Sequence, residues 1–234
     1  MNLLAIDSGN SRIKWGLRGP GGWIVRGASD QAGIEELALA WKSLQPASVI
    51  GSNVAGKAIQ DRIEAMLPGS AFTWIEAQRS QCGVLNGYTV PGQLGPDRWA
   101  ALIGARKLLA MGGLVVSLGT ALTVDILDRD GKFAGGIIAP GLQAMLDALK
   151  RSTRLDPSAG HFAFPPKNTD DAVWSGAVLS LAGTIDKISR LRGNPECLLN
   201  GGDAELVLPH LETRARIVDN LVLEGLVLIS GEKG

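Results

Sequence analysis

The sequence contains one strand–turn–strand pattern twice, and this repeat constrains the fold more than any other feature. The first copy, Leu3–Leu17, reads as an apolar strand, a polar turn centred on Gly9 and a second strand. The second copy, Leu114–Leu127, follows the same plan around Gly119. Because one copy opens each half of the chain, the repeat predicts a duplicated fold. The alternative is a chance similarity between two ordinary hairpins.

Each turn has a composition suited to holding phosphate. Glycine adopts backbone angles that other residues resist, and a tight turn leaves N–H groups pointing outward. In the first copy, Asp7 offers a carboxylate for Mg²⁺ or a water on it, and Lys14 adds positive charge. In the second copy, Ser117 stands in the place of Asp7 and Thr120 in the place of Asn10. Two turns of this kind that face each other can bind a triphosphate from both sides, as in the actin, hexokinase and heat-shock-chaperone class of ATP-binding folds.

The segments after each hairpin predict further strands and helices. Behind the first hairpin we expect a strand, a helix, a strand, a helix and a strand at residues 23–28, 32–44, 47–54, 57–67 and 72–75. Behind the second we expect a strand, two helices, two strands and a helix at residues 133–138, 140–150, 168–191, 197–200, 216–218 and 221–229. This mixed α/β order is similar to a ribonuclease-H-like half. We expect the two halves to span residues 1–112 and 113–234.

Composition limits the classes of function. The 234 residues carry 23 basic and 23 acidic side chains, and the resulting zero net charge argues against a general electrostatic role on nucleic acid. No apolar run reaches the roughly 18 residues of a membrane span, and no signal-peptide pattern is visible. The two cysteines, Cys82 and Cys197, lack metal-ligand spacing and fit a reducing cytosol. We therefore expect a cytoplasmic protein without nucleic-acid or membrane partners.

A second candidate site precedes the second hairpin. The segment Gly95-Pro96-Asp97-Arg98 begins a helix, and it follows an irregular stretch, Gln78–Leu94, that holds the only tyrosine, Tyr88. Long irregular loops in compact proteins are usually functional or disordered. Alternatively, Asp97 is a helix cap and Arg98 is a surface cation. Their position between this loop and the second hairpin favours a role in a site.

Three further features have more than one interpretation. The glycine pair Gly201-Gly202 ends a strand, where it can let a flat adenine approach or simply form a turn. Asp125 follows the second turn, with a role near phosphates and a structural role both open. Small residues along the helix expected after residue 168 allow close packing against another helix, from a second subunit or from the same chain: Gly176, Ala177, Ser180 and Gly183.

Taken together, these motifs resemble those of the type III pantothenate kinases, a family that includes the proteins called Bvg accessory factors. The resemblance covers nearly the whole chain. It rests on the order and spacing of six motifs: DSGNSRIK at 7–14, GPDR at 95–98, LGTALTVD at 118–125, GGIIAPG at 135–141, NTDDAVWSG at 168–176 and NGGDA at 200–204.

This resemblance implies a fold and an activity. The fold is a duplicated ribonuclease-H-like fold of the actin, hexokinase and heat-shock-chaperone type, with mixed sheets flanked by helices. The activity is the ATP- and Mg²⁺-dependent phosphorylation of the primary hydroxyl of pantothenate by a homodimer, the first step of coenzyme A biosynthesis. Two alternatives remain: a kinase for another small alcohol, and an ATP-binding regulator of the same fold without kinase activity.

The resemblance also implies roles for individual residues. Asp97 is expected to be the general base on the substrate hydroxyl, and Arg98 to pair with the pantothenate carboxylate through two parallel hydrogen bonds. Other pantothenate contacts are expected from Gly95, Pro96, Tyr88 and Thr169, with Thr169 reaching across the dimer. The ATP phosphates, and Mg²⁺ through the first carboxylate, are expected to be held by Asp7, Ser8, Gly9, Asn10, Ser11, Arg12, Ile13, Lys14 and Thr120.

One position departs from the family pattern. The family usually has aspartate where this chain has Ser117, and that carboxylate helps to hold a monovalent cation such as K⁺ or NH₄⁺. Serine supplies only a neutral oxygen. The sequence therefore predicts a weaker cation site, a different cation dependence or reduced activity.

Overall fold

The chain divides into two compact units in the computed structural model, which describes residues 2–153, 155 and 159–232. Unit 1 comprises Met1–Ala110, Gly131–Phe133 and Asn220–Gly234, and unit 2 comprises Met111–Asp130 and Ala134–Asp219. The C-terminal helix therefore groups with unit 1. The division into halves at residues 112 and 113 stays a prediction about the duplication of the fold.

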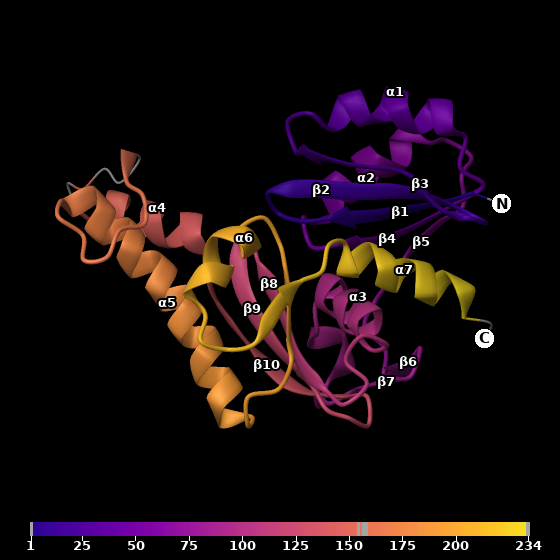
Figure 1. The fold of residues 1–234 in the computed structure, drawn as a ribbon. Helices are drawn as coiled ribbons and strands as arrows, with labels where there is room; N and C mark the ends of the chain where they lie inside the picture. The colour runs from indigo at the N-terminus through magenta and orange to yellow at the C-terminus, as the bar shows by residue number, and fades with distance from the viewer. Residues whose placement is uncertain (1, 154, 156–158, 233–234) are drawn as a thin grey trace. The chain divides into compact units, whose positions relative to one another are not determined.

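Unit 1 is built on a five-stranded mixed sheet with the order β3-β2-β1-β4-β5 (Figure 1). The first three strands pair antiparallel, whereas β1 and β4, and β4 and β5, pair in parallel. Parallel pairing places the ends of β1 and β4 side by side. The strands are β1 Leu3–Ser8, β2 Arg12–Gly19, β3 Gly22–Asp30, β4 Ser48–Asn53 and β5 Phe72–Trp74.

Two helices, α1 (Ile34–Leu44) and α2 (Lys57–Met66), cover one face of this sheet. Alternate residues of β1 and β2 point toward them, as a strand buried on this face requires. Trp41 of α1 and Ile63 of α2 are both fully buried in the same apolar cluster. Removing these large side chains from water is the main source of stability for the layer.

The helices α3 (Pro96–Ala105) and α7 (Leu221–Gly231) lie on the other side of the sheet in Figure 1. A short 3₁₀ helix, η1 (Pro91–Gln93), precedes α3. A side chain at Gly225 would collide with the carbonyl oxygen of Ala100, so this glycine lets the two helix backbones approach closely. The close packing of α3 on α7 fixes the helix that carries Asp97 and Arg98.

A short hairpin, β6 (Ser80–Gln81) and β7 (Val84–Asn86), lies within the stretch predicted to be irregular. β7 pairs in parallel with Lys132 and Phe133, which belong to unit 1. The sequence does not predict these strands because elements of two or three residues are too short to show a periodicity.

Unit 2 repeats the strand order of unit 1. Its strands follow the order β10-β9-β8-β11-β12, so the first strand again lies between the second and the fourth. β8 pairs antiparallel with β9 and parallel with β11, as β1 does with β2 and β4. The predicted duplicated fold with mixed sheets is confirmed. The strands are β8 Gly113–Leu118, β9 Ala121–Leu127, β10 Lys132–Pro140, β11 Cys197–Asn200 and β12 Ala215–Ile217.

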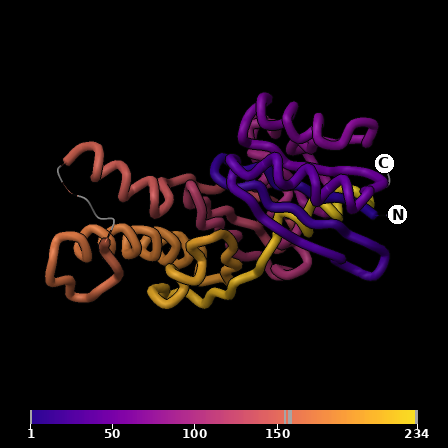
Figure 2. Tube along the Cα trace, turned by 90° about the horizontal axis from the view of Figure 1, so that it is seen from above, coloured from indigo at the N-terminus to yellow at the C-terminus, as the bar shows by residue number. Residues whose placement is uncertain are grey.

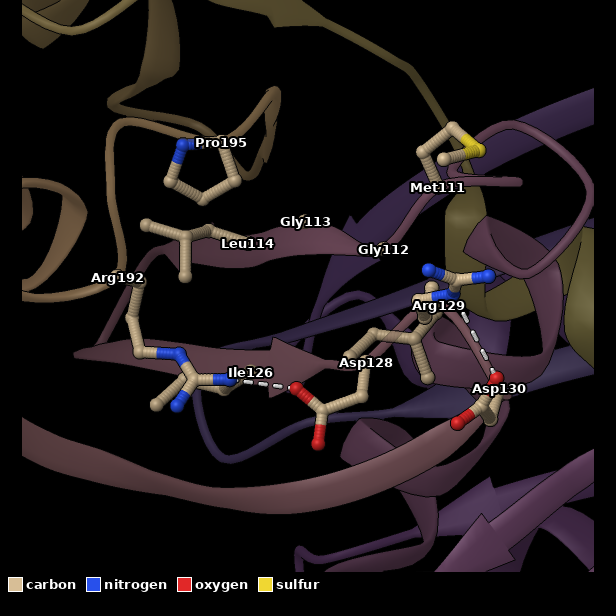
Figure 3. A pocket seen from close by; sticks show the side chains of 11 residues that line it. Met111, Gly112, Gly113, Leu114, Ile126, Asp128, Arg129, Asp130, Arg192 and Pro195 are labelled. Carbon is tan, nitrogen blue, oxygen red and sulfur yellow. Dashed lines mark hydrogen bonds and ion pairs between the residues drawn. The ribbon is translucent and has the colours of Figure 1, made fainter.

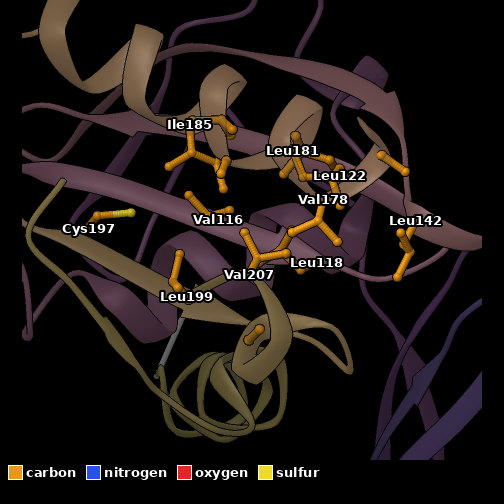
Figure 4. Close-up of a cluster of buried hydrophobic side chains, with 14 of the residues drawn as sticks. Val116, Leu118, Leu122, Leu142, Val178, Leu181, Ile185, Cys197, Leu199 and Val207 are labelled. Carbon is orange, nitrogen blue, oxygen red and sulfur yellow. The ribbon is translucent and has the colours of Figure 1, made fainter. Parts of the chain in front are cut away.

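The long helix α5 (Thr169–Leu191), orange in Figures 1 and 2, packs on one face of the strands of unit 2. Val178, Leu181 and Ile185 of this helix contact the apolar side of β8 and β9, where Val116 and Leu122 lie (Figure 4). Among the described residues, no helix is long and apolar enough to cross a membrane. The helices of unit 2 are α4 Leu142–Ser152, α5 Thr169–Leu191, α6 Ala204–Val207 and the 3₁₀ helix η3 Leu208–His210.

Candidate active site

The first turn of the repeat lies between β1 and β2. The amide of Gly9 donates to the carbonyl oxygen of Arg12 at 3.0 Å and closes the turn. The side-chain amide of Gln31 donates to the carbonyl oxygens of Gly9 at 3.2 Å and Asn10 at 2.7 Å. These contacts hold the turn through its carbonyl groups. A turn held in this way is organised before any ligand binds, which reduces the entropic cost of binding.

Asp7 precedes this turn, and its carboxyl group is strongly perturbed. The hydroxyl of Ser52 donates to Oδ1 of Asp7 at 2.8 Å. Burial raises the pKa of Asp7 from 3.8 to about 6 against the lowering effect of the Ser52 hydrogen bond. The charge of Asp97 raises this pKa further, and the charge of Lys14 lowers it. Carboxylates with raised pKa values are enriched at functional sites.

Asp97 lies in the first turn of α3, where the sequence places it. Gly95 is the N-cap residue and Pro96 follows it, so Asp97 is not the cap residue itself. A side chain at Gly95 would come within 2.6 Å of Oδ1 of Asp97, and the glycine thus leaves room for the carboxylate. Burial raises the pKa of Asp97, whereas the backbone amide and the positive charge of Arg98 lower it.

Arg98 is not the surface cation of the alternative interpretation, because only 7% of the residue is exposed. Its guanidinium carbon lies 6.0 Å from the ring centre of Tyr88 and 5.8 Å from that of Phe133. Nη1 of Arg98 also donates to the hydroxyl of Tyr88 at 3.5 Å. The two rings, 5.0 Å apart, restrict the plane of the guanidinium group. A guanidinium fixed in its plane suits a planar carboxylate.

The second turn lies between β8 and β9 in unit 2. The amide of Gly119 donates to the carbonyl oxygen of Ala121 at 3.2 Å, and the amide of Gly141 donates to that of Thr120 at 3.1 Å. A side chain at Gly141 would collide with the carbonyl oxygen of Gly119. The glycine before α4 therefore packs directly on the turn that is expected to bind phosphate, and it restricts the conformation of Thr120.

Ser117, near the end of β8, is hydrogen-bonded to the asparagine that begins the NGGDA motif. Nδ2 of Asn200 donates to Oγ of Ser117 at 3.0 Å and to the carbonyl oxygen of Val116 at 2.9 Å. Asn200 is 8% exposed and ends β11, the parallel neighbour of β8. The matched strand positions of unit 2 thus carry a neutral, hydrogen-bonded pair.

The two glycines after β11, Gly201 and Gly202, differ in their surroundings. Gly201 has a φ of 108°, and a side chain there would collide with the carbonyl oxygen of Leu118. The turn therefore requires glycine at this position without any ligand. A side chain at Gly202 would meet no atom within 4 Å, so the approach of an adenine remains a prediction for this residue alone.

Two other candidate residues lie in unit 2. Thr169 is the first residue of α5 and is exposed to solvent. Oδ1 of Asn168 caps this helix by accepting from the amide of Asp171 at 2.9 Å, and Asp171 pairs with Nδ1 of His161 at 3.0 Å. Asp125 is 1% exposed on β9, opposite Val115 of β8.

The predicted residues therefore fall into two groups. Unit 1 brings together Asp7, Asp97 and Arg98, with Tyr88 beside the arginine. Unit 2 holds Ser117, Thr120 and Thr169, which are neutral, and the buried Asp125. The partners Ser52, Gln31 and Phe133 belong to none of the six motifs, and Asn200 belongs to one whose contact with Ser117 the motif does not indicate, because these contacts depend on how distant segments pair.

Two cavities lie away from these groups. In unit 2, an open cavity of about 300 Å³ lies where β8 begins and β9 ends, and it is lined in part by the ion pair of Arg192 with Asp128 at 2.5 Å (Figure 3). This is the end of the hairpin opposite to the turn at Gly119. In unit 1, about 380 Å³ lie between the last turn of α3 and α7, lined in part by Cys82 and Lys107. Asp97 is at the other end of α3.

Solved structures of other proteins share the fold of this chain. A Campylobacter jejuni protein assigned to the Baf family of transcriptional activators matches with a TM-score of 0.64 and 20% identity, over 97% of this chain and 96% of that one. The activator of 2-hydroxyisocaproyl-CoA dehydratase from Clostridium difficile, with bound ADPNP, matches with a TM-score of 0.57 and 12% identity, over 98% and 92%. Together with the duplicated sheets, these likenesses define a fold of the actin and hexokinase type.

Sequence comparisons narrow this class to one family. A family model for type III pantothenate kinase matches residues 3–191. The chain is 42% identical to the type III pantothenate kinase of Nitrosospira multiformis, over 98% of this chain and 91% of the relative. It is 45% identical to that of Nitrosomonas eutropha, over 97% and 94%. The chain belongs to the type III pantothenate kinase family, as its motifs predicted.

Proposed function

We propose that this chain transfers the γ-phosphate of ATP to the primary hydroxyl of pantothenate, the first step of coenzyme A biosynthesis. Family membership supports the reaction. One structural observation supports the site: a partly buried carboxylate, Asp97, lies next to a buried arginine at the start of α3. Pantothenate carries a hydroxyl at one end and a carboxylate at the other, so both groups have a partner of suitable chemistry.

In this proposal Asp97 accepts the proton of the attacking hydroxyl. Phosphoryl transfer depends mainly on positioning and charge neutralisation, so the base has to be close to the hydroxyl rather than strongly basic. The raised pKa of Asp97 nevertheless brings it nearer to that of a useful general base. Gly95 and Pro96 would shape the pocket around the hydroxyl. Their glycine–proline sequence fixes where the helix, and hence the carboxylate, begins.

Arg98 and Tyr88 would bind the carboxylate of pantothenate. The aromatic contacts restrict the arginine side chain, so little of its entropy remains to be lost when a carboxylate binds. Thr169 is proposed as a further contact, and in the homodimer it would come from the partner subunit.

The two glycine turns would hold the phosphates of ATP. The proposed phosphate-binding residues come from the first turn and its flanking strands and from one position of the second turn: Asp7, Ser8, Gly9, Asn10, Ser11, Arg12, Ile13, Lys14 and Thr120. Asp7 fits Mg²⁺ or a water bound to it, because Ser52 engages one carboxylate oxygen and leaves the other for a hard cation. Bound there, Mg²⁺ would neutralise charge on the β- and γ-phosphates.

We propose that monovalent cations such as K⁺ or NH₄⁺ have little effect on this enzyme. The position that usually supplies a carboxylate holds Ser117, whose hydroxyl is already bonded to the amide of Asn200. A neutral oxygen competing with an amide donor is a poor ligand for a cation.

We also propose a cytoplasmic homodimer that acts without nucleic acid or membrane. The exposed side of α5 carries Gly176, Ser180 and Gly183 beside Leu179, which is 40% exposed. Ala177, predicted on this stripe, instead faces the core and is 6% exposed. Light scattering is expected to give twice the 24.5 kDa of one chain, and a Gly183→Arg variant is expected to give one chain.

The reaction is tested by mass spectrometry of the product. Purified protein with Mg-ATP and pantothenate is expected to form 4′-phosphopantothenate, and a panel of other small alcohols is expected to give no product. Phosphorylation of a different alcohol in preference to pantothenate would support the alternative that the chain is a kinase for another small alcohol. ATP binding without transfer to any acceptor would support a regulator.

A further inference from the structure

A buried serine on the neighbouring strand contacts the carboxylate of Asp7. β1 and β4 run in parallel, and their register places Ser52 directly beside Asp7. Ser52 is 0% exposed, so water does not compete for its hydroxyl. The hydroxyl donates to Oδ1 of Asp7 at 2.8 Å. Both ends of this hydrogen bond belong to unit 1.

This hydrogen bond restricts a rotation that is otherwise soft. The last torsion of an aspartate side chain has a broad energy profile, so a carboxylate without a partner samples many planes. A donor to one oxygen selects one plane and leaves the second oxygen for another ligand. Hydrogen bonds to an ionised acceptor are about twice as strong as neutral ones, which makes this an effective restraint.

We propose that Ser52 is a positioning residue of the phosphate site: its hydroxyl holds Oδ1 of Asp7 so that Oδ2 is presented to Mg²⁺ or to a water on it. This inference rests on the proposed role of Asp7 in binding Mg-ATP. Partners that orient metal-binding carboxylates typically affect metal affinity by about 10–100-fold. The effect of Ser52 should therefore appear in the affinity for the metal nucleotide.

Three substitutions separate the hydroxyl from the volume of the side chain. Ser52→Ala removes the donor. Ser52→Cys keeps a side chain of similar size with only a weak donor, and Ser52→Thr keeps the hydroxyl. The matched control is Ser189→Ala, because Ser189 of α5 is also 0% exposed and its hydroxyl has no hydrogen-bond partner among the described residues.

The experiment measures binding of Mn²⁺-ATP by electron paramagnetic resonance, without pantothenate and therefore without turnover. The alanine and cysteine variants at Ser52 are expected to bind about 10-fold more weakly. Ser52→Thr and Ser189→Ala are expected to match the wild type. In steady-state kinetics the same two weak binders should show a raised KM for Mg-ATP and an unchanged KM for pantothenate.

Other outcomes overturn the inference in distinguishable ways. If Asp7→Asn weakens binding of Mn²⁺-ATP and Ser52→Ala does not, Ser52 has no positioning role and the proposed function stands. If Asp7→Asn also binds as the wild type does, the proposed role of Asp7 fails, and the inference fails with it. Equal losses in Ser52→Thr and Ser52→Ala would assign the effect to packing and would also overturn the inference.

Discussion

The two hairpins of the repeat share a backbone plan and differ in charge at one matched strand position. Each is followed by a parallel neighbour of its first strand, β4 in unit 1 and β11 in unit 2, in the same register. At the matched strand position, unit 1 has Asp7 with the hydroxyl of Ser52. Unit 2 has Ser117 with the amide of Asn200. Strand pairing thus positions an oxygen and its donor in both units, but only the first oxygen is a carboxylate.

The turns differ in length as well. Residues 9–11 separate β1 from β2, whereas only Gly119 and Thr120 separate β8 from β9. The shorter turn is braced by Gly141, and the longer one by Gln31. A duplicated framework thus retains its strand geometry in both units, while the two carboxylates proposed for metal binding and proton transfer, Asp7 and Asp97, lie in unit 1.

The largest expected effect comes from removing the second carboxylate of unit 1. Asp97→Ala deletes the proposed general base, and turnover is expected to fall by about 10²–10⁴-fold, the usual contribution of such a group. Circular dichroism should show an intact fold. Asp61→Ala, on the exposed face of α2, is the matched control and should keep wild-type turnover. Normal turnover by Asp97→Ala would remove Asp97 from the role of base.

Asp7→Asn gives the first hairpin an uncharged side chain at the position that Ser117 occupies in the second. The substitution keeps the size of the side chain and removes the charge that is proposed to hold Mg²⁺. We expect kcat/KM to fall by about 10²-fold, because preorganised electrostatic contacts typically contribute on that scale. Steady-state kinetics at saturating Mg²⁺ measures the effect. A loss of less than 2-fold would show that unit 1 does not need its carboxylate at this position.

Ser117→Asp tests the opposite change, because it places a carboxylate at the position of the second hairpin that matches Asp7. We expect the variant to become several-fold more active in K⁺ than in Na⁺, whereas the wild type should differ little between them. Ser43→Asp, at an exposed position of α1, controls for added charge alone. Equal activity of the Ser117→Asp variant in K⁺ and in Na⁺ would show that the carboxylate is not sufficient to create a monovalent-cation site.

The smallest expected effect is on stability and its pH dependence. The pKa of Asp7 is raised to about 6 in the fold, so the folded chain binds this proton more tightly than the unfolded chain does. Ionising Asp7 therefore costs stability as the pH rises from about 4 to about 6. Asp7→Asn removes this cost, so its melting temperature should exceed that of the wild type at pH 7.5 and match it near pH 4. A lower melting temperature at pH 7.5 would contradict the burial of the charge.

Features that depend on neighbouring residues, such as the hairpins and helix starts, could be predicted from the sequence. Contacts that depend on which distant strands pair could not. The hairpins followed from apolar strands on either side of the polar turns at Gly9 and Gly119, and the start of α3 followed from its glycine and proline. Ser52 lies 45 residues from Asp7, and Asn200 lies 83 residues from Ser117. No periodicity within one strand indicates which distant strand will be its neighbour.

The arginine site shows the same limit. Arg98 was predicted from its motif, but Phe133 contacts it only because β10 begins beside the short β7, which has too few residues to be recognised. The terminal helix was predicted with the second half, yet α7 packs on α3 of unit 1, where Gly225 permits the contact. Glycines at such positions are visible in a sequence, although the backbone that they approach is not.

The central claim is that phosphoryl transfer to pantothenate depends on the carboxylate of Asp7 in the first hairpin and on no carboxylate at the matched position, Ser117, in the second. The most direct test is ADP release from purified protein with Mg-ATP, with and without pantothenate, in K⁺ and in Na⁺ buffers. We predict release that requires pantothenate and proceeds at similar rates in both buffers. Release that requires K⁺ would contradict the claim that the enzyme, with Ser117 in place of a carboxylate, depends little on the monovalent cation. No release in either buffer, with ATP binding confirmed separately, would contradict the proposed kinase activity.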